Sequence, residues 1–112
     1  MEKVRVNIIP SIEPIPACHI SQNDVGRSID FELYEGLTPY SLSSGATAIL
    51  HLELPDGSFI TKPLANNSSF VTLTVDDDIS EIAGRLYAKI NIVEGEQDIG
   101  TSLIYLDVEK AP

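Results

Sequence analysis

Residues 22–33 read QNDVGRSIDFEL and join a turn to a strand. Asn23, Asp24 and Gly26 are residue types that tolerate or favour turn conformations. The SIDFEL segment that follows alternates apolar with polar or acidic residues at the two-residue period of a half-buried strand. We therefore expect one face of this strand to enter a core and the other to meet water.

Seven more segments have the composition or alternation of short strands and are separated by turn-forming residues. They are residues 4–8, 17–20, 46–54, 59–64, 70–75, 85–92 and 99–108. This pattern predicts an all-β fold, namely an immunoglobulin-like antiparallel β-sandwich of seven to eight strands. An open barrel is the competing topology. One short helical turn is expected near 76–83, where aspartates begin it and Gly84 follows it.

The composition predicts one globular domain. The chain has 112 residues, of which 43% are hydrophobic, and this length lies near the commonest domain size. We expect a single β-sandwich domain over 1–112 with an extended, proline-containing segment at 10–16. No apolar run approaches the roughly 20 residues that span a bilayer, and the N-terminus lacks a stretch typical of a signal peptide. The chain is therefore expected to have no membrane contact and to fold where it is made.

The net charge of the chain is strongly negative. Seventeen acidic residues against seven basic ones give a formal net charge of -10. Such a surface repels the phosphate backbone, so the sequence argues against nucleic-acid binding. It favours solubility, or docking on a basic surface of a partner protein.

Two segments are candidate interaction surfaces. In segment 10–16, Ile12 and Ile15 lie between prolines that keep the backbone extended. This segment either lies along a neighbouring subunit or crosses between the two sheets of its own sandwich. In the last strand both faces are partly apolar, which predicts a central position or a partner over Leu103 and Tyr105.

No catalytic or metal-binding pattern is visible. The single cysteine, Cys18, is followed by His19, but neighbours in a strand point to opposite faces and cannot transfer a proton directly. His51 lies on another strand. The acidic run at 76–81 lacks the glycine and the final acid of a calcium-binding EF-hand loop. We predict a protein that is not an enzyme and that has no cofactor and no metal.

An ordered series of short motifs spans the chain from about residue 6 to residue 108. The motifs are QNDVGR at 22–27, YSL at 40–42, LPDG at 54–57, IAG at 82–84 and IGT at 99–101. This series resembles the N-terminal domain of phage baseplate upper proteins, an immunoglobulin-like module of tailed-phage virions. In that light Asp24, Gly26 and Arg27 are the signature corner of the fold. Independently of the resemblance, Asp24 and Arg27 are a candidate ion pair across the turn, either orienting the start of the strand at Ser28 or forming an ordinary surface pair.

The resemblance implies a non-enzymatic virion structural protein, located in the particle and made in the cytoplasm of the bacterial host. Baseplate members of that family continue into a stalk or adaptor region, whereas this sequence ends at Pro112. The expectation is therefore an auxiliary, decoration or adaptor subunit that docks on capsid or baseplate and tail proteins. We also expect a homo-oligomer within the virion.

The alternative is a carbohydrate-binding or host-adhesion module with the same sandwich. Its stacking platforms would be drawn from the four tyrosines, which are Tyr34, Tyr40, Tyr87 and Tyr105.

Overall fold

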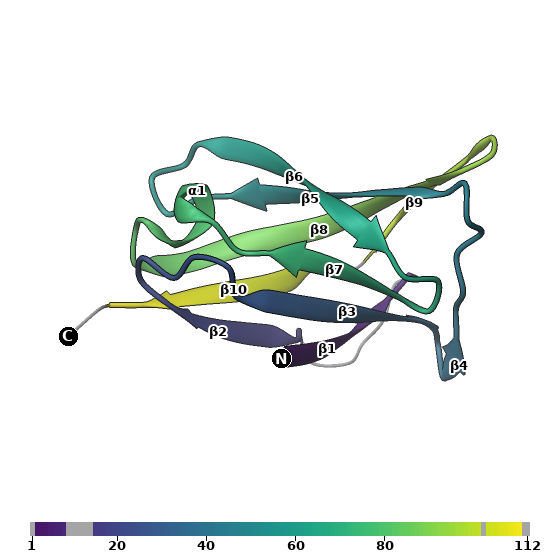
Figure 1. The fold of residues 1–112 in the computed structure, drawn as a ribbon, viewed down its shortest axis with the longest axis horizontal. Helices are drawn as coiled ribbons and strands as arrows, with labels where there is room; N and C mark the ends of the chain where they lie inside the picture. Colours follow the sequence, from purple (N-terminus) through teal and green to yellow (C-terminus); the bar gives the residue numbers. More distant parts are fainter. Residues whose placement is uncertain (1, 9–14, 102, 111–112) are drawn as a thin grey trace.

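The computed structural model of the chain describes residues 2–8, 15–101 and 103–110. This part of the chain forms ten strands and one short helix (Figure 1). The strands are β1 (Glu2–Asn7), β2 (Ala17–Ser21), β3 (Ser28–Glu35), β4 (Thr38–Pro39), β5 (Thr47–Glu53), β6 (Phe59–Asn66), β7 (Phe70–Thr74), β8 (Gly84–Glu94), β9 (Gln97–Gly100) and β10 (Ile104–Glu109). The helix α1 covers Asp77–Ser80, inside the predicted 76–83 segment. The predicted all-β fold is confirmed. Among the described residues no helix has the length and apolarity needed to cross a membrane.

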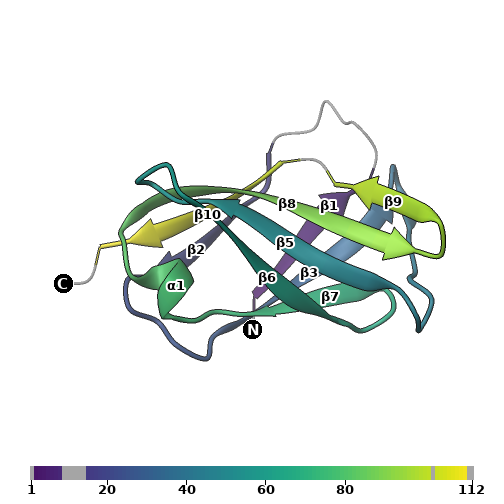
Figure 2. The ribbon, with the colours of Figure 1, turned by 90° about the horizontal axis from the view of Figure 1, so that it is seen from above.

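The strands form two packed layers joined along one side by β6. The first sheet contains β1, β3, β4 and β7, and the second contains β2, β5, β8, β9 and β10. Strand β6 pairs with β5 along Phe59–Leu64 and then with β7 at Ala65 and Asn66. The strand path therefore runs β1-β3-β7-β6-β5-β8-β10-β2 and ends at β1 and β2. Figure 2 shows the strands of the two layers crossing at an angle.

Three details differ from the sequence prediction. The prediction was of antiparallel pairing throughout, but β1 runs parallel to β3 and β2 runs parallel to β10. Period-two alternation carries no information on strand direction, so the sequence could not predict this. The predicted strand 99–108 is divided into β9 and β10 at Thr101, whose Oγ1 accepts the Ile90 N–H and whose N–H donates to the Ile90 carbonyl. The two-residue strand β4 was not predicted. The immunoglobulin-like assignment remains a prediction, since the continuous strand path has features of an open barrel as well.

The N-terminal part of the chain contributes an edge strand to each layer. Strand β1 belongs to the first sheet and β2 to the second, so the chain passes from one layer to the other between Asn7 and Ala17. Residues 9–14, including Ile12, lie outside the described residues.

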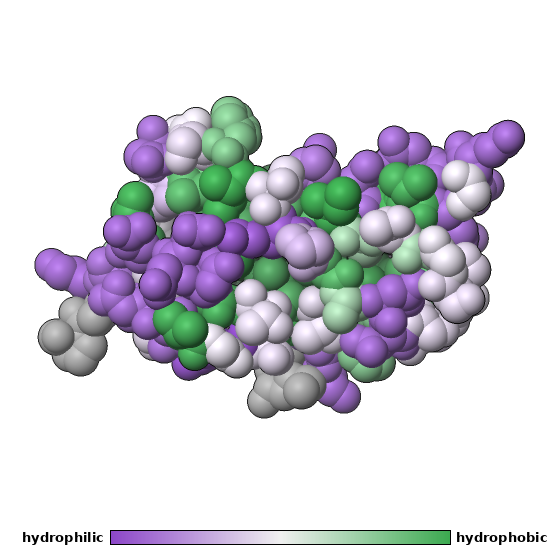
Figure 3. All heavy atoms as spheres, turned by 45° about the horizontal axis from the view of Figure 1, so that its top comes forward, coloured by the Kyte–Doolittle hydropathy of each residue, from purple (hydrophilic) through white to green (hydrophobic). Residues whose placement is uncertain are grey.

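The core lies between the two layers and is filled from alternate positions of the strands. Its largest fully buried side chains are Phe31, Ile20, Ile29, Leu33, Leu50, Leu52, Leu73, Ile79, Leu86, Ile90, Ile92 and Ile104. Ile79 comes from α1, so the helix closes one end of the core. On the face in Figure 3, which brings the β6 and α1 side forward, hydrophobic side chains are set between hydrophilic ones and form no single broad apolar patch.

Candidate functional site

The predicted signature corner is built around the carboxylate of Asp24. Its Oδ2 accepts the Ser21 N–H at 3.0 Å and lies 2.9 Å from Arg27 Nε, so the predicted ion pair with Arg27 is present. Gly26 has a φ of 87°, a conformation that residues with a Cβ rarely adopt, and its N–H donates to the Val75 carbonyl at 2.9 Å. The corner therefore fixes the direction in which the chain leaves β2 and starts β3.

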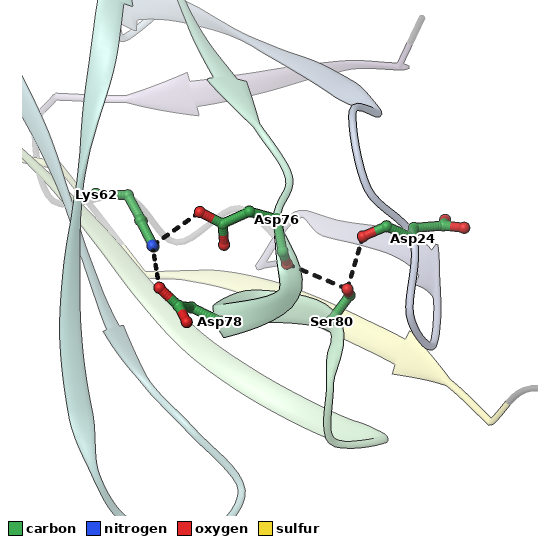
Figure 4. A network of polar contacts seen from close by, with 5 residues as sticks. All are labelled: Asp24, Lys62, Asp76, Asp78 and Ser80. Atoms are coloured by element: carbon green, nitrogen blue, oxygen red, sulfur yellow. Dashed lines mark hydrogen bonds and ion pairs between the residues drawn. The ribbon is translucent and has the colours of Figure 1, made fainter.

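The corner is tied to α1 through Ser80, which is fully buried. Ser80 Oγ lies 2.7 Å from the Asp24 carbonyl oxygen and 3.1 Å from the Asp76 carbonyl oxygen (Figure 4). The Asn23 N–H donates to the Ser80 carbonyl at 2.9 Å. These contacts make the corner a structural joint between distant parts of the chain.

The carboxylates at the start of α1 form ion pairs with a lysine. Lys62 Nζ, on β6, lies 2.9 Å from Asp76 Oδ2 and 2.7 Å from Asp78 Oδ2 (Figure 4). Hydrogen bonds to Asp78 and then Asp76 raise the pKa of Lys62 above its usual range. No group of three or more histidine, cysteine, aspartate or glutamate residues suited to a metal is found among the residues that the structure describes. The arrangement is an ion-pair cluster between β6 and α1.

Cys18 and His19 are on opposite sides of β2. The Cys18 side chain is fully buried in the core, whereas the His19 side chain is 60% exposed and its Nδ1 lies 3.3 Å from Glu109 Oε1. The thiol and the imidazole therefore do not face each other. This is the arrangement that the strand period predicts.

The predicted interaction residues Leu103 and Tyr105 lie on the outer face of the second sheet. Both are half-buried, and β10 is a central strand between β8 and β2, which is one of the two expected placements. The expected partner over Leu103 and Tyr105 stays a prediction. The Tyr105 ring meets the Tyr87 ring edge to face, with centroids 5.5 Å apart and planes at 77°. The Arg85 guanidinium lies 4.1 Å from the Tyr105 ring centroid. Ile15, another of the predicted interaction residues, is 41% exposed just before β2.

Arg85 is itself held by Asp107 on the neighbouring strand. Arg85 Nε donates to Asp107 Oδ1 at 2.7 Å, and Arg85 Nη2 donates to Asp107 Oδ2 at 3.1 Å. The hydrogen bonds from Arg85 lower the pKa of Asp107 below its usual range. The ion pair with Asp107 therefore holds the Arg85 guanidinium beside Tyr105.

A groove of about 630 Å³ opens on the same outer face, next to Tyr87 and Leu103. Its lining includes side chains at outward positions of β5, β6 and β8, namely His51, Glu53, Phe59, Thr61, Tyr87 and Lys89, and it also includes the ion-paired Lys62 and Asp78. Sequence reasoning missed Phe59, Glu53 and Lys89, because their proximity depends on the register between three strands. The signal that could have found this surface is Phe59 itself, an aromatic residue directly after the 55–58 turn that remains 75% exposed.

The other two tyrosines lie elsewhere. Tyr34, on β3 of the first sheet, has the Arg5 guanidinium 3.9 Å from its ring centroid. Tyr40 donates its hydroxyl to Glu94 Oε1 at 3.0 Å, and burial together with Glu94 raises the Tyr40 pKa. The four tyrosines that were considered as stacking platforms therefore do not form one surface, and only Tyr87 and Tyr105 meet.

Comparison with known proteins gives a fold and no sequence family. No family model and no curated protein matches the chain. Among solved structures it is similar to the "N-terminal domain of phage TP901-1 ORF48", with a TM-score of 0.70 and 18% sequence identity. The match covers 98% of this chain and 100% of that chain. The two chains share a fold.

The likeness to the ORF48 domain extends over the whole two-layer structure, including both ends of the strand path. It says nothing about side-chain chemistry, because at 18% identity most residues differ. The signature corner, the Lys62 cluster and the groove are thus described from this chain alone.

Proposed function

We propose that this chain is a non-enzymatic structural protein of a bacteriophage virion, which docks onto capsid or baseplate and tail proteins. The observation that carries the proposal is the full-length fold likeness to the N-terminal domain of a phage protein. The distributed motif resemblance to baseplate upper proteins points the same way. We expect the chain to act in the particle as a homo-oligomeric auxiliary, decoration or adaptor subunit.

The chemistry of the described residues supports binding rather than catalysis. A cysteine nucleophile needs a base within hydrogen-bond reach, but Cys18 faces the core and His19 faces solvent. The carboxylates of the acidic run are held by Lys62. These groups are arranged for stability, and the protein is proposed to work through its surface.

The free edge of β2 is a suitable docking element. The Pro16 carbonyl accepts the Tyr105 N–H, and the Gln22 N–H donates to the Glu109 carbonyl, so the even-numbered residues of β2 face β10. By the strand period, the backbone groups of Ala17, His19 and Ser21 point to the open edge. The Ser21 N–H already donates a hydrogen bond to the Asp24 carboxylate. The backbone of Ala17 and His19 can therefore pair with an extended strand of a partner.

The edge strand of the other sheet is protected differently. Strand β1 carries the exposed cations Lys3 and Arg5, and charged side chains of this kind discourage strand addition. Strand β2 carries neither lysine nor arginine, and its exposed side chains are those of Ala17, His19 and Ser21. This contrast favours β2 as the docking edge.

Co-sedimentation with purified phage particles tests the proposal, using the purified chain and its His19→Pro variant. Proline at 19 removes an edge N–H that β10 does not use, and edge positions of this kind tolerate proline. We expect the unchanged chain to pellet with particles and the variant to remain folded in the supernatant. The docking function would be contradicted if the unchanged chain pelleted neither with assembly intermediates nor with complete particles.

A further inference from the structure

We propose that the groove on the outer face of the second sheet binds an uncharged saccharide. The site is separate from the β2 edge and does not depend on docking through it. Its base is a cross-strand row in which Glu53 pairs with Phe59 on one side and with Tyr87 on the other. Two aromatic residues therefore flank one carboxylate on the same sheet face. Aromatic rings bind the C–H faces of sugars, while a carboxylate between them accepts hydrogen bonds from hydroxyl groups.

The aromatic base is fixed before any ligand arrives. Tyr87 is 44% exposed, and its ring packs edge to face against Tyr105. Tyr105 in turn lies under the Arg85 guanidinium, which the paired contacts with Asp107 hold in place. A platform whose orientation is already set loses less conformational entropy on binding than a free side chain. Tyr87 is therefore a prepared stacking surface.

A second row supplies polar groups next to the first. His51 pairs with Thr61 on β6 and with Lys89 on β8, one pleat further along the same face. In the described part of the chain, the side chains of His51, Glu53 and Lys89 form no hydrogen bond or ion pair with another residue. Imidazole, carboxylate and ammonium together offer both donors and acceptors. Hydroxyl groups, which do both, match this mixed set.

The size and charge of the groove select among ligand classes. A volume of about 630 Å³ lies within the range of small-molecule sites, roughly 300–1,000 Å³. The chain has a net charge of -10, but the groove contains two acidic side chains, Glu53 and Asp78, and two basic ones, Lys62 and Lys89. A locally balanced charge favours a neutral ligand over a phosphate or a strongly charged peptide. The chemistry thus fits a neutral oligosaccharide.

Titration of the isotope-labelled full chain with maltohexaose, cellohexaose and chitohexaose, followed by NMR, tests the site. We expect at least one sugar to shift the amide signals of β5, β6 and β8 around Glu53, Phe59 and Tyr87. Phe59→Ala and Tyr87→Ala should each weaken the affinity by about tenfold, the factor that about 1.4 kcal/mol of stacking represents. Tyr87→Phe, which keeps the ring, should bind like the unchanged chain.

Leu37→Ala is the matched control, because Leu37 is an apolar residue that is 82% exposed in the turn between β3 and β4 of the first sheet. It should leave sugar affinity unchanged. The inference is wrong if none of the three sugars shifts these signals, if the shifts map to Tyr34 and the first sheet, or if Phe59→Ala binds as well as Leu37→Ala. Retained docking on phage particles by Phe59→Ala would separate the failure of this site from a failure of the docking function.

Discussion

The ring of Pro55 lies directly against the backbone of Gly84. A Cβ at position 84 would stand 2.9 Å from Pro55 Cγ and 3.1 Å from Pro55 Cβ, and Gly84 has a φ of 140°. The turn between β5 and β6 therefore rests on the first residue of β8, and two short motifs far apart in the sequence, LPDG and IAG, meet at one contact.

Gly84→Ala should lower the free energy of unfolding by about 2–5 kcal/mol, because it combines an unfavourable φ with a steric overlap. Urea denaturation followed by circular dichroism measures this change. Gly45→Ala is the control, since Gly45 lacks a positive φ and a Cβ there would meet nothing within 4 Å. Equal stability of the two variants would show that the Pro55 contact imposes no constraint.

The signature corner should contribute to stability through Ser80 more than through its ion pair. Ser80→Ala removes a buried hydroxyl from two carbonyl oxygens, which we expect to cost about 1–3 kcal/mol. Arg27→Ala removes one side of a surface pair and should cost less than about 1 kcal/mol. Thermal unfolding of both variants provides the comparison. If Asp24→Ala changed neither stability nor assembly, the corner would have no special role.

The pair of Arg85 and Asp107 should make stability depend on pH in the acid range. Arg85 lowers the folded-state pKa of Asp107 below its ordinary value of 3.8. The stabilisation is therefore complete above that value and is lost as the pH falls through the folded-state pKa. The denaturation midpoint, measured from pH 6 downwards, should fall less steeply in Asp107→Asn than in the unchanged chain. Arg85→Met should reduce this slope by the same amount. A slope that stays unchanged in both variants would contradict this linkage.

Calcium should not stabilise the protein through the acidic run at α1, because the Lys62 ammonium already lies between the Asp76 and Asp78 carboxylates. Differential scanning fluorimetry with and without millimolar calcium should give the same Tm. A rise in Tm that is lost in Asp78→Asn would mean that calcium displaces the lysine, and the structural interpretation of this cluster would then be wrong.

The sequence predicted what depends on local patterns. Alternation at 46–54 gave β5, and the acidic residues before Gly84 located α1. The partly apolar outer face of the last strand was visible from Leu103 and Tyr105. Strand register and direction were not visible, so the parallel edge strands and the row that brings Phe59, Glu53 and Tyr87 together appeared only in three dimensions. The Pro55–Gly84 contact could not be predicted for the same reason, since each residue alone is typical of a turn.

The central claim is that this chain is a component of a phage virion, and mass spectrometry of purified particles tests it most directly. Particles are collected from a culture in which the gene is expressed during phage production and are purified through a density gradient. The account predicts peptides of this chain in the particle fraction, in a fixed ratio to the major capsid protein. Peptides found only in the soluble fraction, with none in the particles, would contradict it.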